Sequence, residues 1–383
     1  MSLNYHFGLL PDYIEKLMAK LRIAVVYGGD KHCPGAVIYK THNPRSTKTY
    51  EAVAHDVAQS LRTIGFQHIF VMADDMTLAA NLKQADIHLV WLNTGGVQGY
   101  NPVCHTPALL EMLGMPYVGH NPLNSSILDN KHAFKRELQG LGFPTAPFMI
   151  WHPSQGCFQP QQNCRFNHIF SHYSGPFVVK PVSGRASLHI RVVNTVAELS
   201  AAVAEVQQMT HNTVLIEKYL PGREFCVSVC GYVTACQGNL SKSPKPFTFS
   251  AFERVLEADE PIFTSMDKKA ITQNRLRSID DEELALKQTL IDLAQRVYWD
   301  FSLNSLVRLD LRTDAEGNLQ ILEANPKPDL KRPKENITSL VAQGLSEYGM
   351  SYDDLILSLL ADRLDYLLTH HVSIITHITD FLV

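Results

Sequence analysis

Two short stretches, Arg308-Leu309-Asp310-Leu311-Arg312 and Leu322-Glu323-Ala324-Asn325-Pro326, flank the turn Asp314-Ala315-Glu316-Gly317-Asn318. This pattern predicts two strands joined as a hairpin, which brings Asp310, Glu323 and Asn325 toward the same place. Mg²⁺ prefers oxygen ligands and is usually held by one or two carboxylates together with substrate phosphates. The hairpin is therefore a candidate metal platform for a nucleotide. An ordinary hairpin with polar residues at its ends is the alternative.

The length and the charge balance limit the kinds of partner. The 383 residues are 45% hydrophobic and 19% charged, which suits a globular protein of two or three domains. Lys and Arg number 34 against 38 Asp and Glu, so the formal net charge is -4. Such a balance provides no strong basic field for nucleic acid or an anionic membrane. We therefore expect small-molecule substrates and neither a nucleic-acid nor a membrane partner.

The cysteines and the N-terminus point to a reducing compartment. The seven cysteines are odd in number and include no CxxC pair. Buried thiols explain Cys226 and Cys230, which lie in a strand-like run, better than a structural zinc site does. The N-terminus has no long apolar signal region, and no window approaches the ~20 apolar residues that span a bilayer. The sequence predicts a cytoplasmic protein.

The hydrophobic pattern divides the chain into four predicted parts. Residues 1-20 are expected to form an amphipathic helical extension. Residues 21-125 alternate apolar strands with helices, as a doubly wound α/β domain does. Residues 126-224 are predicted to form a central α+β domain, and residues 225-383 a C-terminal domain.

Three segments have less regular patterns. Residues 151-174 show little periodicity and are predicted to form a surface loop. Residues 238-278 form a long insert that is a candidate active-site cover. The tail at 372-383 is apolar enough to pack either on a partner or on its own core.

Upstream of the hairpin lie three further candidate features. Lys131 lies on a predicted helix, Lys180 ends a strand before a Gly/Ser loop, and Glu217 opens the stretch that continues to Phe225. Alone, each has a plain structural explanation, because strand-end lysines are usually solvated and such glutamates usually cap loops. Together, two lysines for phosphates, an acidic linker for ribose and two carboxylates for Mg²⁺ form a complete nucleotide site.

With these features in this order, residues 21-367 resemble the ATP-grasp superfamily and, within it, the D-alanine-D-alanine ligase branch. The resemblance is most specific at Phe177-Pro181, at Glu217-Phe225 and in the two hairpin strands. It implies an ATP-grasp fold of α/β and α+β class with three domains. Gly-rich turns and the 238-278 insert suggest that the central domain closes over ATP. The resemblance also implies a homodimer.

The resemblance assigns roles to matching residues. By this resemblance, Lys131 and Lys180 would contact the phosphates of ATP. Glu217, Lys218 and Leu220 would contact its adenine, and Glu224 would contact its ribose.

On the hairpin, the same resemblance implies that Asp310, Glu323 and Asn325 ligate two Mg²⁺ ions, for which Mn²⁺ could substitute. Arg308 would steady the negative charge that develops during reaction, and Ser187 matches a phosphate-loop serine. The family's reaction is the phosphorylation of a carboxylate by ATP, attack by an amine, and release of ADP and phosphate. Such a reaction requires positioning and charge neutralisation rather than a nucleophilic side chain.

The departures from the family concern the substrate. Arg45 aligns with a glutamate that binds the ammonium group of the first alanine, and Ala186 replaces a phosphate-loop serine. After Asn325, a basic segment replaces the family's glycine-rich one, and its cations are Lys327, Lys331 and Arg332. Because a cation repels an ammonium group and attracts a carboxylate, these residues suggest an acidic substrate rather than free D-alanine. Solvated loop charges are the alternative.

Several functions remain open on the sequence alone. The ligase of mycosporine-like amino acid biosynthesis, which joins threonine or serine to mycosporine-glycine, is a candidate family member. A D-alanine-D-alanine ligase proper, a nucleotide-binding protein without catalysis, and a small-molecule kinase are the alternatives.

Overall fold

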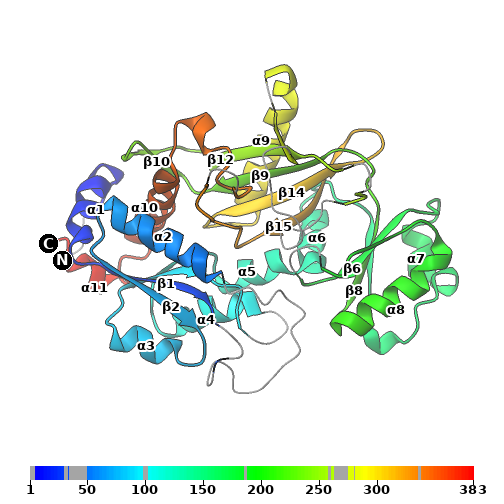
Figure 1. Cartoon of the computed structure of the whole chain (residues 1–383), viewed down its shortest axis with the longest axis horizontal. Coiled ribbons are helices and arrows are strands. Elements are labelled where there is room, and N and C mark those ends of the chain that lie inside the picture. The colour runs from blue at the N-terminus through cyan, green and yellow to red at the C-terminus, as the bar shows by residue number, and fades with distance from the viewer. Residues whose placement is uncertain are drawn as a thin grey trace.

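The computed structural model describes residues 5-29, 33, 50-97, 102-184, 188-257, 260-262, 275-279, 281-334 and 338-383. Arg45, Ala186 and Ser187, to which the sequence assigns roles, lie outside these ranges. The described strands form three larger sheets and one two-stranded sheet. Figure 1 shows the unit that contains β6, β8, α7 and α8 at the end of the molecule opposite the two termini.

The N-terminal unit is built on a parallel sheet. Its strand order is β2-β1-β3-β4, with β1 at Arg22-Gly28, β2 at His68-Asp74, β3 at Leu89-Asn93 and β4 at Tyr117-Val118. Its helices are α2 (Glu51-Ile64), α3 (Leu78-Gln84) and α4 (His105-Met112). The run from Ile23 to Val26 is fully buried because β1 is a central strand covered on both faces. The predicted doubly wound pattern is present.

The N-terminal extension is helical, as the sequence predicts. A short 3-10 turn precedes α1 (Leu10-Met18), in which Leu10, Ile14 and Leu17 are buried. Their spacing of four and three residues places them on one face of the helix. That face packs into the same apolar cluster as β1 and α2.

The central unit has an antiparallel sheet of its own. The strand order is β5-β8-β6-β7, formed by Phe148-Trp151, Val214-Lys218, Phe177-Pro181 and Arg191-Val193. The helix α8 (Leu199-Thr210) contributes Leu199, Val203 and Val206 to the core beside this sheet. The prediction of a surface loop at 151-174 is wrong.

Residues 151-174 contain α7 (Cys164-Ile169), and Phe158, Phe166 and Phe170 are buried in the core of the central unit. Phe166, Ile169 and Phe170 have helical spacing, but the set is short and stands among polar residues. It therefore produces only a weak hydrophobic period, although each aromatic ring buries a large apolar area.

The C-terminal unit contains a five-stranded antiparallel sheet of order β13-β12-β9-β14-β15. Its strands are Leu276-Ser278, Phe247-Arg254, Glu224-Cys230, Val307-Thr313 and Leu319-Asn325. One face packs against α9 (Leu284-Asp300). The predicted cover at 238-278 is wrong over its described strands, because β12 is an internal strand of this sheet and β11 (Asn239-Lys242) pairs with β10 (Val233-Cys236).

The apolar tail packs on its own chain. The long helix α10 (Tyr352-His370) and the short α11 (Thr376-Thr379) follow the last strand. Ile375, Ile378 and Leu382 are buried in the cluster that also holds α1, α2 and α10. The termini meet where Nζ of Lys16 donates to the carbonyl oxygen of Leu382 at 2.8 Å. Among the described helices, none is long and apolar enough to span a membrane.

Candidate active site

The hairpin of β14 and β15 places four predicted residues on one face. In the antiparallel register, Asp310 lies opposite Glu323 and Arg308 lies opposite Asn325. Residues two apart on a strand share a face, so all four side chains project to the same side. Leu309 projects to the other side, into the apolar cluster that contains α9. The sheet therefore has one apolar face that anchors it and one polar face that carries the candidate site.

Asp310 is a buried carboxylate held by two arginines. Nε and Nη2 of Arg308 donate to its two oxygens at 2.8 and 3.0 Å, and Nη1 of Arg254 lies 3.3 Å from Oδ2. Burial raises the pKa of Asp310, but the two guanidinium groups outweigh burial and hold its pKa below the ordinary value. Nδ2 of Asn325 also donates to Oδ2, at 3.3 Å. Asp310 is therefore a charged oxygen donor at neutral pH.

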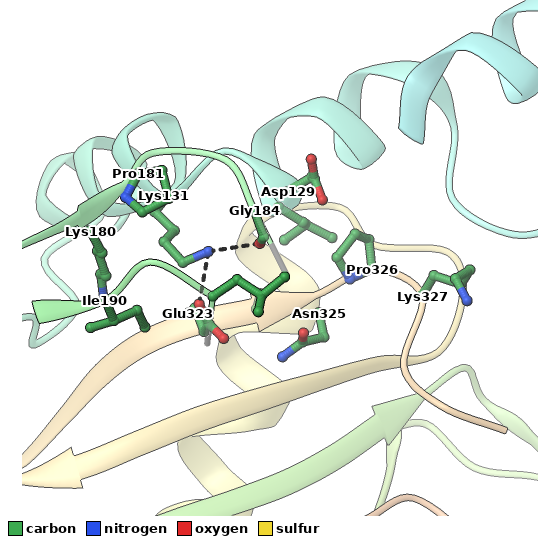
Figure 2. A pocket seen from close by; sticks show the side chains of 13 residues that line it. Asp129, Lys131, Lys180, Pro181, Gly184, Ile190, Glu323, Asn325, Pro326 and Lys327 are labelled. Carbon is green, nitrogen blue, oxygen red and sulfur yellow. Dashed lines mark hydrogen bonds and ion pairs between the residues drawn. The ribbon is translucent and has the colours of Figure 1, made fainter. Parts of the chain in front are cut away.

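Glu323 faces a cleft between the hairpin and the central unit. Nζ of Lys131 lies 3.1 Å from Oε2 of Glu323 and donates to the carbonyl oxygen of Gly184 at 3.2 Å. Figure 2 shows Lys131 reaching both partners, with Asn325 and Lys327 farther along the same wall. The residues that line the cleft are Leu128, Asp129, Lys131, Lys180, Pro181, Gly184, Leu188, Ile190, Glu323, Ala324, Asn325, Pro326 and Lys327.

The cleft is narrow in this conformation. Its cavity volume is about 60 Å³. Lys131 contributes to this narrowness, because its ammonium contacts both Glu323 and Gly184 across the cleft.

Local sequence explains why Lys131 lies at this point. Asn130 caps α6 (Lys131-Gly140), because its side-chain oxygen accepts from the backbone N-H groups of His132 and Ala133. The backbone N-H of Lys131 donates to the carbonyl oxygen of Val182 at 2.8 Å. The start of α6 is thus fastened to the loop of the central unit, with the Lys131 side chain over the hairpin.

Lys180 belongs to a buried group of three charges. Its ammonium pairs with Oε1 of Glu217, and Nζ of Lys135 lies 3.2 Å from Oε2 of the same carboxylate. All three residues are at most 5% exposed. Burial raises the pKa of Glu217, but Lys180 and Lys135 outweigh burial and lower it. The group holds two cations and one anion, so it presents excess positive charge beside the cleft.

Glu224 lies at the start of β9 between two arginines. It pairs with Arg254 of β12, and Nη1 of Arg312 lies 3.5 Å from its Oε2. Arg312 also donates to the hydroxyl of Tyr219 at 3.0 Å, which connects the sheet to the linker after β8. In that linker Leu220 is buried, whereas Nζ of the half-buried Lys218 lies 5.1 Å from the ring centre of Tyr173. The structure therefore places Glu224 on the polar face of the sheet and Lys218 on the central unit.

The basic segment after the hairpin is divided between the cleft and the surface. Lys327 lines the cleft, with Nζ 3.6 Å from the ring centre of Tyr50. Lys331 is half-buried, and its backbone N-H donates to Asp329. Arg332 pairs with Asp353 at 2.5 Å and thereby joins this segment to α10.

Two charged residues that the sequence analysis did not single out belong to the site. Arg254 contacts both Glu224 and Asp310, and Lys135 contacts Glu217. The position of Lys135 four residues after Lys131 was an available signal, since residues four apart lie on one helix face. For Arg254 the signal was the alternation of aromatic and polar residues in Phe247-Arg254, which is typical of a strand and places Arg254 at its end.

The donor set suits a hard cation. Asp310, Glu323 and Asn325 offer carboxylate and amide oxygens, which is the ligand chemistry of Mg²⁺ and Mn²⁺. Within the described ranges, no group of three His, Cys, Asp or Glu residues is placed to hold a metal. A metal at the hairpin would therefore depend on its two carboxylates, the Asn325 amide and oxygen atoms of a bound nucleotide.

Known proteins resemble this chain in sequence and in fold. The sequence model of the family described as D-ala D-ala ligase C-terminus matches residues 138-361. The D-alanine-D-alanine ligase of Pseudomonas putida (strain GB-1) is 26% identical over 346 residues, which cover 89% of this chain and 92% of that protein. The ligase of the same name from Synechococcus sp. (strain JA-3-3Ab) is 26% identical over 285 residues, which cover 74% and 78%.

The solved structure of D-alanine-D-alanine ligase from Bacillus anthracis complexed with ATP has the same fold. It superimposes with a TM-score of 0.65 at 19% sequence identity and covers 90% of this chain and 97% of that one. The expected ATP-grasp fold and the resemblance drawn from the sequence motifs are confirmed. Since the family's sequence model covers more than half of the chain, the chain belongs to the D-alanine-D-alanine ligase branch of the ATP-grasp superfamily, a family of ADP-forming ligases.

Proposed function

We propose that this protein is an ATP-dependent carboxylate-amine ligase that forms an amide or peptide bond. The observation that carries the proposal is the cleft in which Lys131 and Lys180 face Glu323 and Asn325. Cations for phosphate oxygens and oxygen donors for Mg²⁺ are the two requirements of phosphoryl transfer. ATP would phosphorylate a substrate carboxylate, and an amine would then displace the phosphate to form the C-N bond.

The proposed nucleotide contacts follow the path of the chain around the cleft. Lys131 and Lys180 neutralise phosphate charge from α6 and β6. Residues of β8 and the linker after it surround the adenine, and Glu224, at the start of β9, accepts from the ribose hydroxyls. The adenine residues of this proposal are Glu217, Lys218 and Leu220.

On the hairpin we assign metal binding to Asp310, Glu323 and Asn325. Bound Mg²⁺ would supply electrostatic stabilisation to the phosphates. Arg308 holds Asp310 in place with two hydrogen bonds, and its guanidinium group adds a positive charge to the polar face of the sheet. We also propose that Ser187 contacts a phosphate group of the nucleotide.

For the substrate pair, we propose an amino acid and a carboxylate-bearing partner other than D-alanine. Lys327 in the cleft wall supports this proposal, and Arg45 and Lys331 are further candidate cations for the partner's carboxylate. Arg332, in contrast, pairs with Asp353, and we propose that it mainly links segments. Mycosporine-glycine with threonine or serine is the candidate pair.

D-alanine with itself is the second candidate pair. The relatives named D-alanine-D-alanine ligase, aligned over most of this chain, support it. We further propose that the enzyme acts in the cytoplasm. We also propose that it is a homodimer, and sedimentation velocity would test this oligomeric state.

The test is a phosphate-release assay with Mg²⁺ and ATP over a matrix of amine and carboxylate substrates. The matrix includes D-alanine alone, single amino acids, and mycosporine-glycine with threonine or serine. Release that requires both members of an acidic pair supports the proposal. Turnover with D-alanine alone would establish the second candidate, and nucleotide binding without turnover across the matrix would favour a binding protein.

A further inference from the structure

Lys135 is a buried lysine to which the proposed nucleotide contacts give no role. It lies one helical turn after Lys131 on α6, and its side chain is fully buried. Its ammonium lies 3.2 Å from Oε2 of Glu217, donates to the hydroxyl of Thr145 and lies 5.4 Å from the ring centre of Phe148. A lysine is rarely buried so completely unless a partner holds its charge.

Glu217 has a lysine on each carboxylate oxygen, and the two lysines differ in access. Lys180 pairs with Oε1 and lines the cleft. Lys135 pairs with Oε2 and is fully enclosed. A ligand in the cleft can therefore attract Lys180, whereas Lys135 stays with Glu217.

The charge balance around Glu217 changes when Lys180 turns toward an anion. Glu217 is 2% exposed, and a buried carboxylate without a counter-ion is strongly unfavourable. With Lys135 in place, Glu217 keeps one partner while Lys180 serves the ligand. The other charges near this group are Glu323 on β15 and Glu224 on β9, which act on Lys180 at longer range.

We propose that Lys135 is a positioning residue for nucleotide binding, the fixed counter-ion of Glu217 that frees Lys180 for the phosphates. This inference rests on the proposed function in one respect, the contact between Lys180 and phosphate. It adds that the affinity for polyphosphate depends on a lysine that never touches the nucleotide.

The test compares Lys135→Met with the wild-type protein. Methionine keeps an unbranched side chain without the charge, so Glu217 retains Lys180 alone. We expect the Kd for MgATP to rise about 10- to 100-fold, since binding must then break the last ion pair of a buried carboxylate. Adenosine, which has no phosphates, should bind both proteins equally. Arg136→Met, at the exposed next residue of α6, is the matched control and should leave both affinities unchanged.

A second pair of variants separates this role from simple packing. Glu217→Gln removes the carboxylate that requires a counter-ion, so adding Lys135→Met in that background should change the MgATP affinity little. A packing role predicts the same loss in both backgrounds. In the double variant Lys180 is the only charge of this group that remains, and it lines the cleft. Circular dichroism of each variant checks that it is folded before the affinities are compared.

The outcomes are distinct. Failure of the wild-type protein to bind MgATP would refute the proposed function itself. Wild-type binding with an unchanged Kd in Lys135→Met, or an equal loss in both backgrounds, would overturn the positioning role and leave the proposed function standing.

Discussion

Nζ of Lys131 lies 3.1 Å from Oε2 of Glu323, so an ion pair joins the first turn of α6 to the hairpin across the cleft. The same ammonium donates to Gly184 in the loop of the central unit. A residue expected to hold phosphate therefore also links the two walls of the cleft. Entry of a nucleotide must replace these contacts with contacts to phosphate oxygens.

Replacement of Lys131 should weaken ATP binding more than it slows the chemical step. In Lys131→Met the charge-assisted contact to phosphate is lost, and we expect the KM for ATP to rise about 10- to 100-fold. Steady-state kinetics over a range of ATP concentrations measure this. Lys83→Met, an exposed lysine of α3, serves as the control. An unchanged KM for ATP would contradict the role of Lys131.

Glu323→Gln should nearly abolish turnover while the fold persists. The amide keeps the shape of the side chain but removes a charge that the proposed metal site would require, so we expect kcat to fall by a factor of at least about 100. ADP formation in the presence of substrates, followed against Mg²⁺ concentration, provides the readout. Glu316→Gln changes an exposed glutamate in the turn of the same hairpin and should retain full activity. Normal turnover in Glu323→Gln would remove Glu323 from the metal site.

His120 should make the protein less stable in mild acid. It is buried with Nε2 3.1 Å from the carbonyl oxygen of Leu306, and burial lowers its pKa from 6.5 to about 4. Between these values the unfolded chain binds a proton that the folded chain excludes. The free energy of unfolding is thus highest above about pH 6.5 and falls by up to about 3 kcal/mol as the pH drops to about 4.

Chemical denaturation between pH 7 and pH 4 measures that decline. His120→Gln has no titrating group at this site, so its stability should fall less over the same range. His168→Gln changes an exposed histidine of α7 and should follow the wild-type curve. If His120→Gln also followed that curve, His120 would not be the source of the pH dependence.

The C-terminal tail should contribute to stability within its own chain. Ile375 is fully buried in the cluster shared with α1 and α10, whereas its neighbour Ile374 is 50% exposed. Ile375→Ala should therefore lower the free energy of unfolding by about 2-5 kcal/mol, and Ile374→Ala should change it little. Urea denaturation compares them. Equal effects would contradict the packing of the tail.

Elements with a strong local pattern could be predicted from the sequence. The apolar run of β1 and the turn between β14 and β15 each determine a structure that depends little on distant residues. The strand β12 was missed because its neighbours in sequence are rich in Ser, Pro and Lys, so that the segment resembles a loop. Its place inside a sheet depends on pairing with β9, which no local pattern records.

The candidate site likewise combines contacts that a local pattern predicts with contacts that depend on distant residues. Asp310 and Glu323 are strand residues at paired positions, so the hairpin alone brings them together. The contacts of Lys135 and Lys180 with Glu217 join three separate elements. Such contacts arise only from tertiary packing, so no local pattern indicates that both lysines share one carboxylate.

The most direct test of the central claim, activation of a carboxylate by ATP, follows an isotopically labelled oxygen. The carboxylate of the substrate pair that supports turnover is labelled, and the released inorganic phosphate and the joined product are analysed by mass spectrometry. If the carboxylate is phosphorylated before the amine attacks, a labelled oxygen appears in the released phosphate. Unlabelled phosphate, or phosphate that remains attached to the substrate, would contradict the assignment of this protein as a carboxylate-amine ligase.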